Sequence, residues 1–460
     1  MAEPRLRQAF RRWPAITVVA VCALASISCK RTGDLAESPS TTQSSPAWQG
    51  TASQLLKTIF TRYRNAVSYH DEGRVRLSYL VDDQSHSETA PLSVTLDADA
   101  IDVRAYDVRL HKDDGQLSAW IDDPSTNHFD SQALRVAVPA GRPILDSILA
   151  DPVLADHLQS GLAGPPPQLE WLLADEPMKK LFDDEHQFAF ASESSVAGHA
   201  CHVVRVDAQG DRYQFWIDQK EGVIRRVELP NSTLSSQLTL ATELKLTLEL
   251  DGATFRSVSS SDSQNSGVTS PPGNAKWVGR FVPLPPIEPA PILGSRPDGF
   301  QLKNAVGEVT LSASGRPQPI RVLGRFAGGD DSVAAAALLQ NWNSRLPPNV
   351  RARTQVIIVV DRAAADQIPT PLTLPIAIDN DHHAERQFAI TPGGLTILDP
   401  DGQIAWVQPQ VTPAALVAAG TIIGDIIEGV DVPRRLRQQW GRDIQAYQEA
   451  LEKASVRVGG

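Results

Sequence analysis

The stretch "QFAITPGGLTILDPDGQIAWV", residues 387–407, decides the fold of the second half of this chain. Within it, "GLTILD" predicts a strand, "DPDG" a turn and "QIAWV" a second strand, so the stretch predicts a hairpin. The dipeptide Thr391–Pro392 stands ahead of the first strand, separated from it by one glycine. A dipeptide of this kind often forms one wall of an active site, so the next question is whether the rest of such a site exists.

Helices and apolar strands alternate on both sides of this hairpin. The segments "QPIRVLGRFA", "RTQVIIVVD" and "LPIAID" predict buried strands rich in β-branched residues. The segments "DDSVAAAALLQNWNSRL" and "TPAALVAAGTIIGDIIEGV" predict helices, and a shorter helix is expected around "HHAERQF". This alternation is typical of an α/β domain with a partly parallel sheet.

The order of these elements resembles the thioredoxin-like fold in its redoxin branch of thiol-disulfide oxidoreductases and peroxiredoxins. The residues that carry the resemblance are "FAI-TP" and "LTILDPDG". By this resemblance Thr391 and Pro392 occupy the cis-proline position, although an extra glycine in "GG" shifts the spacing by one residue. The resemblance covers residues 294 to about 430 and implies a Cys-x-x-Cys motif opposite that proline.

The cysteines implied by the family are missing. After "GRFA" the chain reads "GGDDS", so Gly329, Asp330, Asp331 and Ser332 occupy the degenerate motif position, and no cysteine follows Cys201. Thiol-disulfide exchange and peroxide reduction both need a thiolate. We therefore expect a redox-inactive domain, in which these residues act as N-caps of the following helix.

The first half of the chain has a period of two in its apolar residues. Segments such as "GRVRLSYLV" and "LKLTLELDG", separated by turns such as "KDDG" and "QKEG", predict an antiparallel sheet, and the intervening "QLEWLLADEPMKKLF" predicts a helix laid on one face. A further helix is expected at "TASQLLKTIFTRYRNAV", with Thr51 or Ser53 as its cap. The predicted class is thus α+β, an antiparallel sheet with one or two helices on a face, followed by the α/β domain; that the sheet is a curved half-barrel is implied only by the family resemblance of this half.

This half resembles the periplasmic lipoprotein-carrier (LolA-like) family, whose half-open barrel holds acyl chains. The residues that carry the resemblance are "GHACHVVRVD" and "DRYQFWIDQKEGVIRRVELP". By the resemblance, an acyl chain or a lipoprotein is the expected ligand, and Trp171, Phe215 and Trp216 could line an apolar groove. The alternative is that these aromatic residues form the ordinary core between sheet and helices.

The N-terminus has the pattern of an export signal. Arginines in "MAEPRLRQAFRRW" precede an apolar segment that ends in "LASIS" and Cys29, which resembles a bacterial lipobox. We expect Cys29 to be lipidated and the protein to lie at the periplasmic face of the outer membrane; ordinary secretion is the alternative. Of the three cysteines, Cys22, Cys29 and Cys201, only Cys201 would then remain as a free thiol.

Composition narrows the range of functions. A net charge of -11 without a basic cluster argues against nucleic-acid binding. The segment "DNDHHAE" gathers acids and histidines, but its spacing is not that of a metal site. Neighbours on a strand point to opposite faces, so Cys201 and His202 are not expected to form a catalytic pair. No cofactor is expected.

Shifts in composition predict the domain organisation, with Ser- and Pro-rich segments as linkers. The expected parts are a signal peptide (1–29), a tether (30–50), a carrier-like domain (51–252), a linker (253–292), a thioredoxin-like domain (293–430) and a C-terminal amphipathic helix and tail (431–460). The expected function is that of an anchored binding or scaffold protein with an envelope protein as possible partner. The alternative is a thiol oxidoreductase of the cell envelope.

Overall fold

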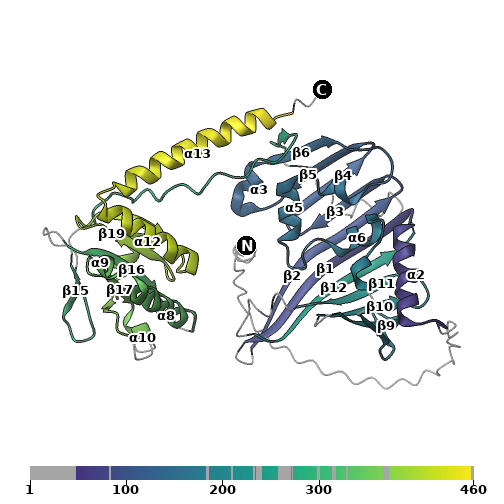
Figure 1. The fold of residues 1–460 in the computed structure, drawn as a ribbon, viewed down its shortest axis with the longest axis horizontal. Helices are drawn as coiled ribbons and strands as arrows, with labels where there is room; N and C mark the ends of the chain where they lie inside the picture. The colour runs from purple at the N-terminus through teal and green to yellow at the C-terminus, as the bar shows by residue number, and fades with distance from the viewer. Residues whose placement is uncertain are drawn as a thin grey trace, which may run out of the picture. The chain divides into compact units, whose positions relative to one another are not determined.

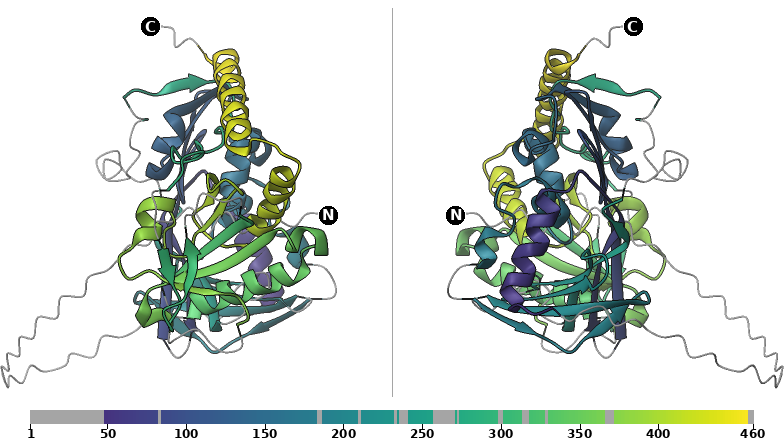
Figure 2. Two further views of the ribbon diagram at one scale, coloured as in Figure 1. Left: turned by 90° about the vertical axis from the view of Figure 1, so that its left-hand side faces the viewer. Right: turned by 90° about the vertical axis from the view of Figure 1, so that its right-hand side faces the viewer.

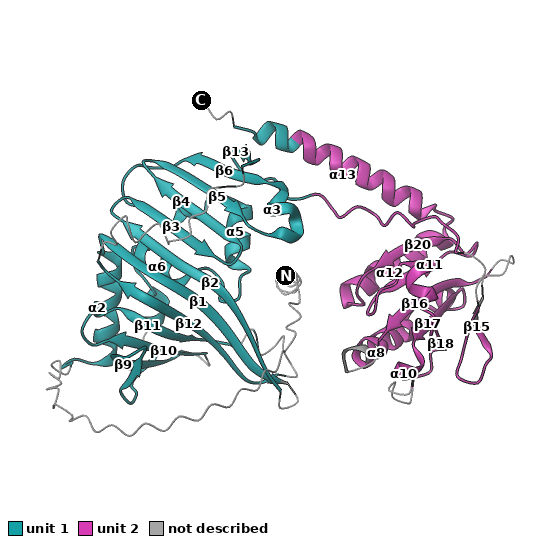
Figure 3. Ribbon diagram, turned by 180° about the vertical axis from the view of Figure 1, so that it is seen from behind, with its two compact units in different colours: residues 1–284, 450–460 teal, residues 285–449 magenta. Residues whose placement is uncertain are grey.

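The computed structural model describes residues 48–81, 84–182, 186–208, 211–231, 234, 241–256, 271, 273–297, 301–312, 318–327, 330–365 and 372–456. The expected signal peptide, Cys29 and most of the tether lie outside these residues. The chain forms two compact units, Met1–Leu284 with Ala450–Gly460 (unit 1) and Pro285–Glu449 (unit 2) (Figure 3). None of the helices in the described ranges is long and apolar enough to span a membrane.

Unit 1 is built on a curved sheet of 13 strands, ordered β13-β6-β5-β4-β3-β2-β1-β12-β11-β10-β9-β7, with β8 also paired to β9 (Figure 1). All its pairs are antiparallel except β13 with β6. The strands are β1 (Ser68–Val81), β2 (Gln84–Asp97), β3 (Ala100–Ala105), β4 (Val108–Asp113), β5 (Gln116–Ile121), β6 (Gln132–Ala137), β7 (Gln187–Phe190), β8 (Ser194–Val196), β9 (His199–Ala208), β10 (Asp211–Asp218), β11 (Ile224–Leu229), β12 (Thr242–Thr254) and β13 (Lys276–Val278).

Helices of unit 1 pack on one face of this sheet, where α2 runs across the strands (Figures 1 and 2). Helix α2 begins after Thr51, whose hydroxyl accepts from Gln54 N at 3.2 Å while Gln54 Oε1 accepts from Thr51 N at 2.9 Å. This capping box confirms the expected start of the helix. The described helical elements are α2 (Ala52–Arg64), η1 (Pro124–Thr126), α3 (Asn127–Asp130), α4 (Leu145–Ile148), α5 (Pro152–Gln159), α6 (Pro167–Leu173) and η2 (Lys179–Phe182).

Strand β13 lies in the stretch that the sequence suggested as a linker. It pairs with β6, and Val278 also forms a bridge with Ser455 near the C-terminus. A strand of three residues flanked by Ser- and Pro-rich segments carries too little alternation to be recognised from sequence.

Unit 2 contains a mixed sheet of seven strands, ordered β15-β14-β18-β17-β16-β19-β20. Strands β16, β17 and β18 are parallel, and β19 and β20 form the antiparallel hairpin expected from "GLTILDPDGQIAWV". Its elements are β14 (Gln301–Lys303), β15 (Val309–Ser312), β16 (Ile320–Phe326), α8 (Asp330–Arg345), α9 (Pro348–Arg351), β17 (Thr354–Val360), α10 (Arg362–Ala365), β18 (Ile376–Ile378), α11 (His383–Phe388), β19 (Leu395–Leu398), β20 (Ile404–Gln408) and α12 (Pro413–Ile427). Helix α13 (Val432–Ala454) follows.

Both faces of the central strands β17 and β19 are buried, which explains why these strands are mostly apolar. On β17, Val356 and Ile358 join a core with α8 and α12, whereas Ile357 and Val359 join a second core with α11. The expected α/β architecture with a partly parallel sheet is confirmed, and the order and directions of β16, β17, β19 and β20 agree with a thioredoxin-like domain.

Candidate functional site

The candidate site of unit 2 lies where β16 ends and the Thr391–Pro392 segment passes beside it. Arg325 O accepts from Gly393 N at 2.7 Å, and Arg325 N donates to Gly394 O at 3.1 Å. These two bonds hold the segment against the end of β16, immediately before the degenerate motif. Thr391 and Pro392 are exposed.

Little is described of the residues at the motif position. Gly329 is outside the described residues, and Asp330, Asp331 and Ser332 begin α8 without a description of their side chains. Their expected capping role therefore stays a prediction. That the position lacks sulfur follows from the sequence, because the whole of residues 285–449 contains no cysteine.

The remaining thiol, Cys201, lies on β9 of unit 1 and is fully buried. Its Sγ donates to His199 O at 3.3 Å, and burial raises the pKa of the thiol. A nucleophilic thiol needs the opposite, a lowered pKa and access to solvent. Cys201 has neither property.

A buried arginine stands at the candidate site instead of a thiol. Arg325 is 4% exposed and points to the α11 face of the sheet, because the next residue, Phe326, packs in the core with α8 and α12 on the opposite face. Its Nη1 donates to Glu385 Oε2 at 2.5 Å and its Nη2 to His382 Nδ1 at 2.7 Å. A longer contact of 3.5 Å reaches Ile390 O. We call Arg325, His382 and Glu385 the arginine cluster.

Electrostatics and backbone geometry both fix this cluster. The hydrogen bond and charge of Arg325 lower the pKa of Glu385, so its carboxylate stays ionised. His382 and Ala389, which flank α11, have φ values of 53° and 51°. Left-handed backbone costs a residue other than glycine about 1 kcal/mol or more, so the surrounding contacts must hold α11 in place.

Side chains of the segment "DNDHHAE" form hydrogen bonds with the protein itself. Asp379 accepts from His383 N at 2.8 Å and from Ala384 N at 2.7 Å, and His382 faces the Arg325 guanidinium. In the ranges that the structure describes, no group of three or more His, Cys, Asp or Glu residues could hold a metal ion. A cation beside Arg325 would in any case meet a like charge.

Sequence reasoning missed Arg325, although a signal for it exists. An arginine inside the apolar strand "IRVLGRF" of a parallel sheet must either find a partner or remain costly to bury. Glu385 and His382 supply partners from 60 and 57 residues away. The sequence alone could not show which acid would meet it.

In unit 1, the three aromatic residues of the suggested groove do not share one surface. Trp171 and Phe215 are buried, and both contact Phe60, with ring centroids 6.0 and 5.9 Å apart. Trp216 is half-buried and points to the other face of β10, where its Nε1 donates to Ser194 Oγ at 3.2 Å. Trp171 and Phe215 therefore belong to a packed aromatic cluster under α2.

Comparison with solved structures finds proteins similar to part of this chain. StoA from Bacillus subtilis is 17% identical and matches 27% of this chain and 97% of its own, with a TM-score of 0.23. A thioredoxin-like protein from Aeropyrum pernix is 15% identical over 29% of this chain and 89% of its own (TM-score 0.21). A SCO1/SenC family lipoprotein from Bacillus anthracis is 9% identical over 30% and 99% (TM-score 0.25). No protein-family model matches the sequence, and no curated protein matches it.

Proposed function

We propose that this protein is an exported binding or scaffold protein, anchored by a lipid on Cys29, whose thioredoxin-like unit performs no thiol chemistry. One observation carries the proposal. The Thr391–Pro392 segment is hydrogen-bonded to the end of β16, yet the unit that contains both has no cysteine. Without a cysteine, this unit has no thiolate nucleophile with which to perform thiol chemistry.

Unit 1 is the proposed ligand-binding part, and an acyl chain is the proposed ligand. The support is the continuous curved sheet with helices on one face, together with its resemblance to lipoprotein carriers in β9 to β11. The aromatic cluster of Phe60, Trp171 and Phe215 is packed under α2, so the proposed ligand would contact the part of that face that the helices leave uncovered. Binding there would bury apolar surface of the ligand, at about 25 cal/mol per Å².

A turnover assay tests the absence of thiol chemistry. The purified chain from residue 30 onward is assayed for insulin disulfide reduction and for peroxide reduction, beside its Cys201→Ser variant. We expect both proteins to stay at the uncatalysed rate, since the thiol is buried. Turnover well above background would overturn the proposal, and its loss in Cys201→Ser would assign the activity to that thiol.

Two further experiments test the anchor and the ligand. Palmitate labelling of the full chain in a bacterial host should label the wild type and not Cys29→Ser; equal labelling would contradict the anchor. Native mass spectrometry of the purified chain should show co-purified acyl lipid that dissociates on collisional activation. A protein that carries no lipid and also fails to take up palmitate would leave unit 1 as a structural element only.

A further inference from the structure

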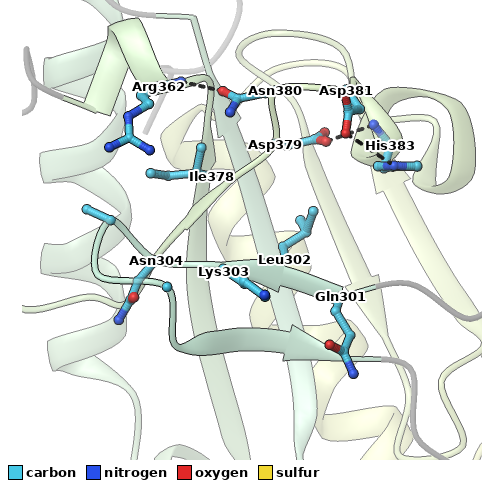
Figure 4. Close-up of a pocket in the computed structure, with 12 residues that line it drawn as sticks. Gln301, Leu302, Lys303, Asn304, Arg362, Ile378, Asp379, Asn380, Asp381 and His383 are labelled. Atoms are coloured by element: carbon cyan, nitrogen blue, oxygen red, sulfur yellow. Dashed lines mark hydrogen bonds and ion pairs between the residues drawn. The ribbon is translucent and has the colours of Figure 1, made fainter.

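Unit 2 contains a pocket that is separate from the Thr391–Pro392 segment. Its volume is about 300 Å³. Figure 4 shows the segment Asp379–His383 along one side and the β14 residues along the opposite side, with Arg362 at one end. The lining residues are Gln301, Leu302, Lys303, Asn304, Ala305, Gly307, Arg362, Ile378, Asp379, Asn380, Asp381 and His383.

Backbone pairing and side-chain caps fix the walls of this pocket. Lys303 on β14 pairs with Ile378 on β18 in antiparallel register. Asp379, which is 2% exposed, accepts from the backbone N–H groups of His383 and Ala384 and so holds the opposite side. Asn380 Oδ1 accepts from Arg362 N at 3.1 Å, which ties the arginine to the same side. The pocket is therefore formed before any ligand enters.

The charges around the pocket are unequal. Lys303 and Arg362 are both exposed, and neither side chain has an ion pair or hydrogen bond with any residue in the described part of the chain. The carboxylate of Asp379 is buried, and each of its two oxygens accepts a hydrogen bond from a backbone N–H group. Asp381 is 80% exposed and lies 3.8 Å from His383 Nε2, at the edge of the pocket. The exposed charged side chains that line the pocket are therefore two cations and one acid.

We propose that this pocket binds a small organic carboxylate through Lys303 and Arg362. Ammonium and guanidinium groups make short, charge-assisted hydrogen bonds to carboxylate oxygens. The volume lies at the lower end of the range for small-molecule sites, which suits a ligand of a few carbon atoms. Ile378, which pairs with Lys303 and is partly exposed, offers apolar contact to its carbon skeleton, which an inorganic ion would not use.

This site goes beyond the function proposed above, because neither an acyl chain in unit 1 nor a thiol takes part in it. It also differs from the arginine cluster, although the two are joined through one segment. His382 faces Arg325, while the next residue, His383, lines the pocket. A ligand in the pocket would therefore lie one residue away from the partner of a buried arginine.

Titration calorimetry of the purified full chain at low ionic strength tests the proposal. The probes are succinate, its neutral analogue succinamide and inorganic phosphate. We expect succinate to bind with a stoichiometry of one and to weaken with added salt, and succinamide not to bind. Phosphate binding as tight as succinate binding would show a site for oxyanions in general and overturn the assignment to a carboxylate.

Variants locate the site. Lys303→Gln and Arg362→Gln should each weaken succinate binding by about tenfold, as expected for the loss of one charge-assisted hydrogen bond. Arg353→Gln is the matched control, because Arg353 is exposed in the same unit and does not line the pocket. Asp381→Asn should tighten binding several-fold by removing a like charge, an effect that a purely structural role would not produce. No detectable succinate binding, or binding unchanged in Lys303→Gln and Arg362→Gln, would refute the proposal.

Discussion

Asp71 offers the sharpest quantitative test of how unit 1 is built. It lies on β1 at a register shift between His70 and Glu72 and is 1% exposed. Its Oδ1 accepts from Gly73 N at 2.9 Å and from Val94 N at 3.2 Å, and Gln168 Nε2 on α6 lies 3.5 Å from Oδ2. These bonds favour the carboxylate, but burial outweighs them and raises the pKa of Asp71 to about 7 from 3.8.

The raised pKa makes the stability of unit 1 depend on pH. Between about pH 4 and pH 7 the folded protein binds a proton that the unfolded chain releases, so the free energy of unfolding falls as the pH rises through this window. Above about pH 7 the free energy of unfolding falls no further on account of Asp71. A difference of about three pKa units corresponds to about 4 kcal/mol, as an upper limit.

The perturbation is Asp71→Asn, which keeps the shape of the side chain and cannot ionise. The amide oxygen can still accept from Gly73 N and Val94 N, and only the long contact of 3.5 Å between Oδ2 and Gln168 Nε2 is lost. We expect the variant to be about 2–4 kcal/mol more stable than the wild type near pH 8. Near pH 4 the two should agree within about 1 kcal/mol.

Urea unfolding followed by tryptophan fluorescence measures this difference, because Trp171 lies in the neighbouring aromatic cluster, 5.5 Å from Tyr63 between ring centroids. The two units can unfold separately, so the transition that includes Trp171 is analysed alone. Asp97→Asn is the control, since Asp97 is exposed at the end of β2. If Asp71→Asn gains no stability near pH 8, or keeps the pH dependence of the wild type, the reasoning on a buried, ionisable Asp71 fails.

Three further outcomes follow from particular residues. A Cβ at Gly73 would lie 2.2 Å from Leu92 O, so Gly73→Ala should destabilise unit 1 by about 2 kcal/mol or more in urea unfolding. At Gly420 in α12 a Cβ would have no atom within 4 Å, so Gly420→Ala should stabilise this helix by about 0.5–1 kcal/mol. Arg325→Met should lower the free energy of unfolding of unit 2 by about 2 kcal/mol. Arg325→Lys should recover only part of this loss, because one ammonium group cannot replace the two guanidinium nitrogens that contact Glu385 and His382. Full recovery in Arg325→Lys would contradict the role of both contacts. Cys201 should react with a disulfide reagent slowly in the native chain and rapidly in urea, and equal rates would show that the thiol is not buried.

Much of the secondary structure could be predicted because it depends on local pattern. The Thr51 cap, the hairpin of β19 and β20 and the helix α13 all follow from spacing and turn residues within short windows. The short strand β13 could not be predicted, because its place depends on pairing with β6, more than 130 residues earlier in the chain.

For the candidate sites, too, some features could be predicted from the sequence and others could not. That unit 2 lacks a thiol nucleophile is a fact of composition, and no folding could supply one. That Trp216 faces away from Trp171 and Phe215 follows from alternation along β10, but only the packing of α2 and α6 shows which face is covered.

The sequence by itself thus determined the elements of this protein and the chemistry that one unit cannot perform. The tertiary structure alone decided which charges meet. Arg325 contacts His382 and Glu385, Asp71 becomes buried beside Gln168, and Lys303 and Arg362 come to line the same pocket. The physical reason is that hydrophobic periodicity is local, whereas the burial and pairing of a charge depend on chain segments brought together from far apart.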